Sequence, residues 1–534
     1  MKTTASLLFL CAFVFSFHAF GQSPTFGLLK SDIGATDGYT LFTPQNNTDV
    51  YLIDNCGEVI NKWTFSENAG LSCYLLENGN LLRAGKDSLE IRDWDNTLVW
   101  SYAMNVNGYL QHHDIEPLPN GNILCVLTDI YTDTVAIEQG RNPANIGATI
   151  KLEKIIELKP IGTNDAVLVW EWKFIDHLIQ DFDNTKANFG VVADSPELFD
   201  FNYATINEFD IIHLNAVDYN AELDQLIISA KHTHELYIID HSTTLLEAAG
   251  HTGGNSNRGG DFLWRWGNPQ VYQQGSASDQ TLFDQHDPKW IPSAFPDSGK
   301  ISVFNNNGDS TYSFSAMTII APEFVGTAYT MDPNKFLPLA AEWSWNGSIL
   351  GDLVFENKKC GMQVLSSGNV LFCQSAIGRL TEINRNGDHI WSYRNPTYNG
   401  GAIYNQFDVI TTTANTMFRG ERYEPTYPGL VGENLTPQGL IENQNPLQLA
   451  CVLGVDELDY KNELIVVNPT SNGLLNFNQS LNNASVVVID MLGRIVYTEN
   501  GLNGNVINLN VEHGAYLLRV TQQGKASQQK ILVR

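Results

Sequence analysis

The chain has 534 residues and a formal net charge of −28 at neutral pH. Nucleic-acid binding depends on a basic surface, so this excess of carboxylates argues against a nucleic-acid partner. The length exceeds that of one ordinary domain, and we therefore expect either a large repeat fold or several domains.

Residues 1–21 combine one lysine with an apolar run from Ala5 to Phe20. The run is shorter than the roughly 20 residues that a bilayer requires, and its Ala19-Phe20-Gly21 end suits a signal peptidase. We expect a secretory signal peptide at 1–21 and no membrane span. Export would permit disulfides among the six cysteines that follow, but the sequence does not choose their pairing.

A Trp-x-aromatic triplet recurs six times in the chain and defines a repeat. The triplets are Trp63-Thr-Phe65, Trp100-Ser-Tyr102, Trp170-Glu-Trp172, Trp264-Arg-Trp266, Trp343-Ser-Trp345 and Trp391-Ser-Tyr393. Alternation along a strand places both aromatic rings on one face, and most triplets follow a turn and an earlier strand. The repeat therefore predicts an all-β fold, a six-bladed β-propeller over residues 22–435.

The ends of this region are expected to close the ring. Residues 50–65 supply only the last two strands of a blade, and residues 404–419 supply two strands with no triplet after them. Inner strands should then begin near Leu71, His113, His213, His286, Cys360 and Tyr404. The insertions 128–148, 175–209 and 310–335 are too long for hairpin loops, so we expect them to cover one face.

Three histidines, His113, His213 and His286, occupy the same position in three successive repeats. Equivalent positions of a closed repeat fold face one axis, so the three imidazoles should converge there. The next residues on the strands, Asp114 and Asp287, should face away from the axis and be structural. Cys360 takes the corresponding position in the fifth repeat, where a small inert residue is the commoner role.

Five further histidines fall outside the repeat register, and we expect them to be loop or surface residues: His112, His232, His234, His241 and His251. Two arginines, Arg419 and Arg422, lie near the closing blade and could line one face.

The composition shifts to Pro, Gly, Asn and Gln after about Arg422, which predicts a linker over 436–462. Residues 463–534 then form an all-β stretch, expected to be a small C-terminal β-sandwich. Through Asn468-Pro-Thr-x-x-Gly473, Asp490-Met-Leu-Gly-Arg494 and a basic end, this stretch resembles the sorting domain of the type IX secretion system. The resemblance implies a Bacteroidetes-type bacterium, contact with the secretion machinery, and export across the outer membrane to the surface or medium.

The propeller region resembles the arylsulfate sulfotransferase family. The specific segments are His113-Asp, His213-Leu-Asn215 followed by Ser229-Ala-Lys231, and Gln285-His286-Asp287; Gly260-Asp-Phe-Leu-Trp-Arg-Trp-Gly and Phe418-Arg-Gly-Glu-Arg-Tyr accompany them. Members of this family move a sulfuryl group from a phenolic sulfate ester to another phenol without a nucleotide donor. The resemblance therefore implies small phenolic substrates and no cofactor.

The same resemblance implies a role for each matching residue. His286 would be the nucleophile, forming a sulfohistidine in a ping-pong mechanism, and His113 would exchange a proton with the phenol. His213, Asn215 and Lys231 would hold the sulfuryl oxygens. The family pattern has arginine where this chain has Lys231, so bidentate contact with two sulfate oxygens is lost there.

Two other functions remain open at this point. Three converging histidines could bind zinc or iron and make the protein a metal-dependent hydrolase or lyase, although Lys231 would repel the cation. The protein could also be a non-catalytic surface propeller that binds glycans or a partner.

Overall fold

The computed structural model describes residues 23–203, 209–326, 328–398, 400–409, 414–442, 473–490, 494–522 and 525–533. The chain divides into two compact units, Met1–Gly454 and Val455–Arg534, and this boundary falls within the expected linker. The expected signal peptide at 1–21 and linker residues 443–462 lie outside the described residues.

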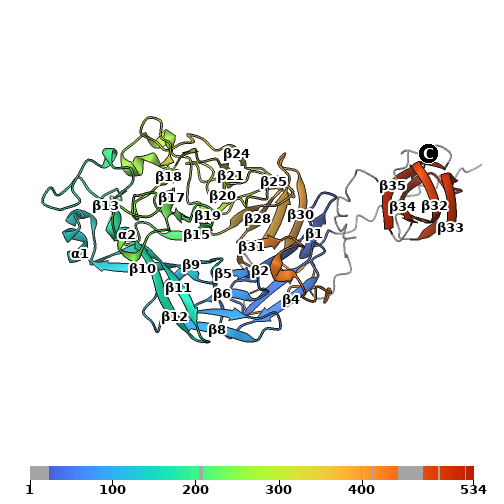
Figure 1. Ribbon diagram of the computed structural model, residues 1–534, viewed down its shortest axis with the longest axis horizontal. Helices are drawn as coiled ribbons and strands as arrows, with labels where there is room; N and C mark the ends of the chain where they lie inside the picture. Colours follow the sequence, from blue (N-terminus) through green and yellow to red (C-terminus); the bar gives the residue numbers. More distant parts are fainter. Residues whose placement is uncertain are drawn as a thin grey trace, which may run out of the picture. The chain divides into compact units, whose positions relative to one another are not determined.

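Among the described residues of the first unit, six antiparallel sheets of four or five strands dominate (Figure 1). The first sheet contains β5 (Ala69–Leu75), β6 (Leu81–Gly85), β7 (Ser88–Arg92) and β8 (Leu98–Ala103), and the second contains β9 (Gln111–Pro117), β10 (Ile123–Thr132), β11 (Thr149–Ile161) and β12 (Asp165–Lys173). The third contains β15 (Leu214–Asn220), β16 (Gln225–Ala230), β17 (Glu235–Asp240) and β18 (Trp264–Trp266), and the fourth contains β19 (His286–Trp290), β20 (Ile301–Asn305), β21 (Ala316–Ile320) and β24 (Trp343–Trp345). The fifth contains β27 (Gly361–Val364), β28 (Val370–Gln374), β29 (Arg379–Ile383), β30 (His389–Arg394) and β1 (Gly27–Ser31), and the closing sheet contains β31 (Met417–Tyr423), β2 (Tyr39–Pro44), β3 (Asp49–Ile53) and β4 (Val59–Thr64).

The first strands of these sheets contact one another in a closed cycle. β5 packs beside β9, β9 beside β15, β15 beside β19, β19 beside β27, and β27 beside β31, which returns to β5. Sheets that succeed one another in this way surround a central axis, as in a β-propeller. The fold is therefore nearly all-β, antiparallel and propeller-like.

The tryptophan triplets connect the outer strands in a second cycle. The first tryptophan of each triplet donates its indole N–H to an oxygen of the sheet, or its loops, that comes next around the ring. The pairs are Trp63 with Asp93 O (2.8 Å), Trp100 with Asp165 O (2.9 Å), Trp170 with Thr243 Oγ1 (3.0 Å), Trp264 with Leu337 O (2.8 Å), Trp343 with Arg385 O (3.2 Å) and Trp391 with Asn55 O (2.8 Å). The repeat thus marks contacts between sheets as well as strands within them.

Apolar side chains fill the space between neighbouring sheets. In one such cluster, Leu82 and Leu89 of the first sheet pack with Ile123 and Ile156 of the second. Burying apolar surface between sheets is the main driving force for this arrangement. Because each core joins two sheets, every sheet helps to fix the position of the next.

The ring closes differently from the prediction. Of the described residues beyond 400, only β31 joins the closing sheet, and the N-terminal part supplies three strands, β2, β3 and β4. The prediction of two strands from 404–419 was wrong, and the inner strand begins at Met417 rather than near Tyr404. Residues 39–44 are buried on both faces after Tyr39, so they lack the alternation that reveals a strand in a sequence.

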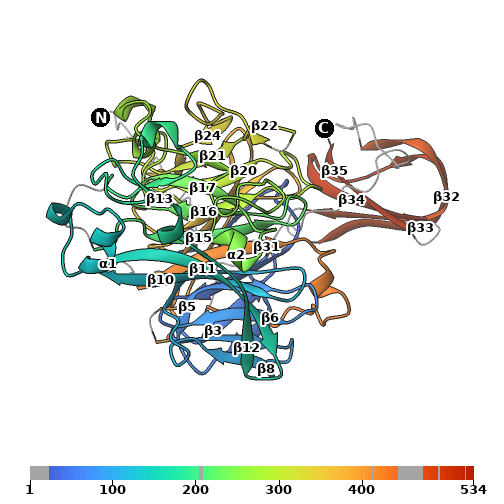
Figure 2. The same cartoon turned by 60° about the vertical axis from the view of Figure 1, so that its left-hand side comes forward.

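The long insertions have different structures. The first extends the hairpin of β10 and β11, which carries α1 (Asp133–Glu138) and a 3-10 turn, η1 (Pro143–Asn145), at its far end (Figure 2). The second contains η2 (Phe174–His177), β13 (Leu178–Ile179), η3 (Val192–Asp194) and β14 (Phe199–Asp200), and the third contains β22 (Phe324–Val325) and β23 (Ala328–Tyr329). The remaining short elements are α2 (Leu245–Ala248), η4 (Pro269–Tyr272), η5 (Ala277–Asp279), β25 (Ser348–Ile349), β26 (Asp352–Leu353) and η6 (Pro428–Leu430).

The second unit contains one antiparallel sheet within its described residues. Its strands lie in the order β33 (Ile495–Asn508), β32 (Leu474–Asp490), β34 (Gly514–Gln522) and β35 (Lys525–Val533). Leu475, Val486, Leu518 and Ile531 belong to its own apolar core. A second sheet is not present in these residues, so the sandwich stays a prediction.

Candidate functional site at the histidine end of the ring

Two of the repeated histidines, His113 and His213, lie face to edge, with 4.9 Å between their ring centroids. Both have left-handed backbones, with φ of 58° and 57°; His113 is the third residue of β9, and His213 directly precedes β15. Burial lowers the pKa of His113 well below its usual value, and the neighbouring His112, His213 and His286 lower it further. The structure therefore brings the three repeated imidazoles into one electrostatic neighbourhood.

His286 is buried, and its surroundings define which ring nitrogen carries the proton. Nδ1 lies 2.9 Å from the carbonyl oxygen of Asp284 and 2.7 Å from Oδ1 of Asn306, so Nδ1 is the donor. Nε2 accepts a hydrogen bond from the backbone N–H of Lys359 at 3.2 Å. Burial lowers the pKa of this imidazole to about 3, and the charges of Arg419 and Lys231 act in the same direction. His286 is thus a neutral base with its lone pair on Nε2.

His112 and His232 also belong to this cluster. His112 was expected in a loop or at the surface but lies in β9, whereas His232 lies in the turn between β16 and β17, as expected of a loop residue. His112 Nε2 lies 2.6 Å from Oε2 of Glu153, and its Nδ1 lies 2.7 Å from Nδ1 of His113. His232 stacks on His213 at 4.7 Å between centroids. The expectation failed for His112 because it directly precedes His113, whose positive φ breaks the strict alternation of side chains along the strand.

A carboxylate and a lysine position His213. Asp210 Oδ2 accepts from His213 Nδ1 at 2.7 Å and lies 3.0 Å from the ammonium of Lys151. Burial alone would raise the pKa of Asp210, but the His213 hydrogen bond and the Lys151 charge reverse this and lower it. Lys151 also contacts Glu153 at 2.9 Å, which links the His112 and His213 sides of the cluster. Nothing in the sequence around Lys151 indicated this role.

Lys231 and Asn215 have different environments. The backbone N–H of Lys231 donates to the carbonyl oxygen of His213 at 3.1 Å, and its ammonium has no ion pair within the described part of the chain. Asn215 is fully buried and donates its amide to the carbonyl oxygen of Gln285 at 2.7 Å. Asn215 therefore holds the backbone next to His286 through its amide nitrogen, while its Oδ1 has no hydrogen-bond partner within the described residues.

Arg419 occupies the interior of the ring, where it joins Asp114 and Asp287. Its Nη1 lies 2.7 Å from Asp114 and 3.0 Å from Asp287, and its Nη2 donates to the carbonyl oxygen of Asn215 at 3.1 Å. These partners lie on β9, β19 and β15. The expectation that Asp114 and Asp287 face away from the axis was wrong, because register shifts and the positive φ of His113 and Asp287 break the strict alternation.

Cys360 does not extend the histidine series into the channel. It is buried in an apolar cluster with Met362 and Phe372, and burial raises the pKa of its thiol well above the usual value. Cys56 forms a disulfide, whereas Cys73, Cys125, Cys360 and Cys373 are free thiols. The small and inert role expected of Cys360 agrees with this packing.

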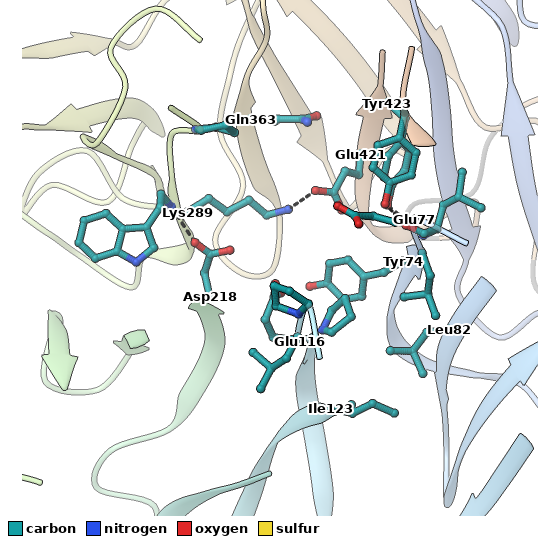
Figure 3. A pocket seen from close by; sticks show the side chains of 18 of the residues that line it. Tyr74, Glu77, Leu82, Glu116, Ile123, Asp218, Lys289, Gln363, Glu421 and Tyr423 are labelled. Carbon is teal, nitrogen blue, oxygen red and sulfur yellow. Dashed lines mark hydrogen bonds and ion pairs between the residues drawn. The ribbon is translucent and has the colours of Figure 1, made fainter. Parts of the chain in front are cut away.

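The inner strands line a cavity of about 540 Å³ at their other end (Figure 3). Each of the six contributes at least one polar residue: Tyr74, Glu116, Asp218, Lys289, Gln363, and both Glu421 and Tyr423 of β31. Lys289 contacts Glu421 at 2.7 Å, and Asp218 accepts from the backbone N–H of Trp290 at 2.7 Å. Burial raises the pKa of Asp218 and also that of Glu116, which the charge of Asp218 raises further. Arg419 and its two aspartates therefore separate a histidine end from a carboxylate end.

The geometry limits the metal-site alternative. Two groups of the described residues bring at least three potential ligand atoms within 4.8 Å of one another, and neither contains all three repeated histidines. One group is Asp210, His213 and His232, but the Lys151 ammonium lies 3.0 Å from its carboxylate, and a cation there would oppose metal binding. The other group, His177, His251 and Asp261, lies outside this cluster.

Together, the fold and this site define an all-β ring protein with a cluster of neutral and paired imidazoles at one end of its axis. The chain belongs to the arylsulfotransferase (ASST) family, whose model matches residues 74–396. Residues 468–534 match the secretion system C-terminal sorting domain. The protein is therefore exported by the type IX system to the cell surface or the medium, and family membership supports a sulfotransferase-type function. No described helix is long and apolar enough to cross a membrane.

Comparisons with individual proteins add little. No curated protein matches the chain. Similar solved structures include a protein of unknown function from Bacteroides caccae, with 13% identity, coverage of 67% of this chain and 93% of that chain, and a TM-score of 0.35. An inactive virginiamycin B lyase from Staphylococcus aureus has 8% identity, coverage of 74% and 98%, and a TM-score of 0.33. PorZ of Porphyromonas gingivalis has 12% identity, coverage of 91% and 74%, and a TM-score of 0.25. Similarity at these TM-scores carries no argument about this protein.

Proposed function

We propose that the protein transfers a sulfuryl group from a phenolic sulfate ester to a second phenol through a sulfohistidine on His286. The observation that carries this proposal is the state of His286. Its Nδ1 proton is fixed on Asp284 and Asn306, its pKa is about 3, and Nε2 therefore retains a lone pair at any ordinary pH. A neutral imidazole in this state is a competent nucleophile.

In the first half-reaction, the Nε2 lone pair attacks the sulfur atom and the bond between sulfur and the ester oxygen breaks. The donor phenol leaves with that electron pair and takes up one proton. The Lys359 N–H, which lies 3.2 Å from Nε2, must give way as sulfur approaches and can then donate to a sulfuryl oxygen. In the second half-reaction, the acceptor phenol attacks sulfur, loses its proton and regenerates neutral His286.

The proposed proton carrier is His113, acting with His112. His112 Nε2 donates to Glu153, so its Nδ1 can either accept from or donate to Nδ1 of His113. When His113 takes a proton at Nε2 from a phenol, it can pass its Nδ1 proton to His112. This relay compensates for the low pKa of His113 and shuttles the proton between the donor and acceptor steps.

Positive charge for the sulfuryl oxygens would come from Lys231, since its ammonium has no counter-ion within the described residues. Charge spreads over three oxygens in the loose transition state of such a transfer, so a fixed cation stabilises it. His213, whose Nδ1 donates to Asp210, would use its Nε2 toward a sulfuryl oxygen. Asn215 is assigned a positioning role here, because its amide holds the backbone carbonyl of Gln285.

The proposal also takes the six sheets as the six blades of one propeller and the tail sheet as part of a small sandwich. Both cycles described above, through the inner strands and through the tryptophans, support the blade count. A metal-dependent hydrolase or lyase at Asp210, His213 and His232 remains the second candidate, because these ligand atoms converge. Insensitivity of the activity to a chelator would argue against it.

The test is phenol release from a chromogenic aryl sulfate by the full mature chain, with and without a second phenol. We expect acceptor-dependent release, and His286→Asn should reduce it by roughly 10⁴-fold or more, as nucleophile removal does in other covalent enzymes. The matched control is His241→Asn, since His241 is also largely buried but pairs with Asp224 and Glu157 away from the cluster. Equal activity of both variants would reject His286 as nucleophile, and no release from folded wild-type protein would favour a binding propeller.

A further inference from the structure

A second cluster of ligand atoms lies away from the histidine end. His177 ends η2, His251 follows α2, and Asp261 precedes β18, so three separate segments meet there. Oδ1 of Asp261 lies 2.8 Å from Nδ1 of His177 and 2.8 Å from Nδ1 of His251. These atoms all lie within 4.8 Å of one another. Neither the repeat nor the proposed transfer uses any of these residues.

The hydrogen-bond partners of His177 do not suit a neutral imidazole ring. Its Nε2 lies 2.9 Å from the carbonyl oxygen of Ala248, which can only accept, so Nε2 carries a proton. In a neutral ring, Nδ1 then holds a lone pair. That lone pair points at a carboxylate oxygen, and two acceptors repel each other unless a proton or a metal ion lies between them.

The surroundings favour a ligand geometry. The other nitrogen of a metal-bound histidine is normally held by a backbone carbonyl or a carboxylate, which is the role Ala248 has here. His177 is 0% exposed and stacks on Trp172, with ring centroids 5.3 Å apart and an angle of 5° between the planes. A Cβ on Gly260 would lie 2.6 Å from His177 Nε2, so glycine at 260 is what lets this imidazole fit. The Trp172 indole donates to the Gly260 carbonyl at 2.7 Å and holds that segment.

We infer that His177 Nδ1, His251 Nδ1 and a carboxylate oxygen of Asp261 bind a divalent transition-metal ion, with Zn²⁺ as the best match. Two imidazoles and one carboxylate are a common zinc donor set. Tetrahedral ligands at about 2.0 Å are separated by about 3.3 Å, so the two 2.8 Å contacts need only open slightly. The side chain of His251 is 60% exposed, which leaves the fourth position to solvent and gives the ion a route in.

The ion would act as a cross-link. It would tie the start of the 175–209 insertion to the loop after α2 and to the segment that leads into β18. Binding of a ligand only to the folded state raises stability, so zinc should stabilise this unit. The inference does not depend on sulfuryl transfer, because none of its ligands lies in the histidine cluster.

The experiment uses the full mature chain, purified without chelator. We expect about one zinc per chain by elemental analysis, as structural sites retain their metal. The apo protein should bind Co²⁺ with the intense visible spectrum of a tetrahedral site, and removal of the metal should lower the melting temperature. His251→Ala and Asp261→Asn should each weaken zinc binding by at least about 100-fold, because loss of a ligand costs more than loss of an outer contact.

The control is His241→Ala, which removes another histidine held by two carboxylates. It should leave the zinc content and the Co²⁺ spectrum unchanged. His251 is exposed, so its alanine variant should remain folded, and circular dichroism would verify this. Absence of both zinc and Co²⁺ binding in folded wild-type protein would overturn the inference and leave an imidazolium–carboxylate pair. Unchanged affinity in His251→Ala would overturn it as well.

Discussion

Lys231 differs from Lys151 and Lys289, two other lysines near the axis, because its ammonium lacks a carboxylate partner within the described residues. Lys151 contacts Glu153 and Asp210, and Lys289 contacts Glu421. An unpaired cation close to neutral imidazoles attracts an anionic group, and the net negative charge of the chain makes such a local attraction necessary. Lys231, where the resemblance to the family implies an arginine, is therefore the residue that we propose as the oxyanion contact.

We expect Lys231→Ala to lower kcat/KM for an aryl sulfate by about 10²–10³-fold, the usual effect of removing one oxyanion donor. Lys231→Arg should raise kcat/KM, because a guanidinium can contact two sulfate oxygens at once. Steady-state kinetics on one donor would measure both. Lys159→Ala, at an exposed lysine of β11, is the control. An alanine variant with wild-type kinetics would remove Lys231 from the mechanism.

At the scale of elements, Arg419 connects strands that do not pair with one another. β31 carries the guanidinium, and its partners lie on β9, β15 and β19. Desolvating two carboxylates and one guanidinium is costly, but once they are buried each depends on the others. Arg419 thus helps to hold the closing sheet against the opposite side of the ring.

Arg419→Gln should destabilise the protein by about 3–5 kcal/mol, because it leaves Asp114 and Asp287 buried without their cation. The free energy of unfolding in urea would measure this. A matched surface change is Lys62→Ala, which breaks the contact of Lys62 with Asp49 at a 44% exposed side chain. That loss should not exceed about 1 kcal/mol. Equal effects of the two changes would mean that Arg419 contributes no more than a surface pair.

On the scale of the whole molecule, the first unit is a ring in which β31 from the far end of the unit pairs with β2 from its beginning. A fold of this kind is complete only when both ends are present. The second unit contributes a separate core, with its own buried residues in β32–β35.

A chain that ends at Gly454 should therefore keep the melting temperature and the aryl sulfate activity of the first unit. A chain that ends before Met417 should lose both, because β2 then has no partner on one side and Arg419 is gone. Differential scanning calorimetry and the phenol-release assay would compare the two. Loss of stability in the chain that ends at Gly454 would show that the two units depend on each other.

The sequence by itself determined the features that depend on local period. The tryptophan triplets predicted the outer strands, and they also make the contacts between sheets; the equal placement of His113, His213 and His286 predicted their convergence. Both predictions rest on local regularities: side chains alternate between the two faces of a strand, and a repeat places equivalent residues at equivalent positions.

Only the tertiary structure decided how the ring closes and which side chains complete the site. β2 is buried on both faces, so its sequence lacks the alternation of apolar and polar residues that would predict a strand. Asp114 and Asp287 turn inward because the backbone at the strand starts has positive φ, which periodicity cannot anticipate. Arg419 reaches its partners across more than 100 residues of sequence. Contacts of this kind depend on where distant strands meet, and local sequence carries no signal for them.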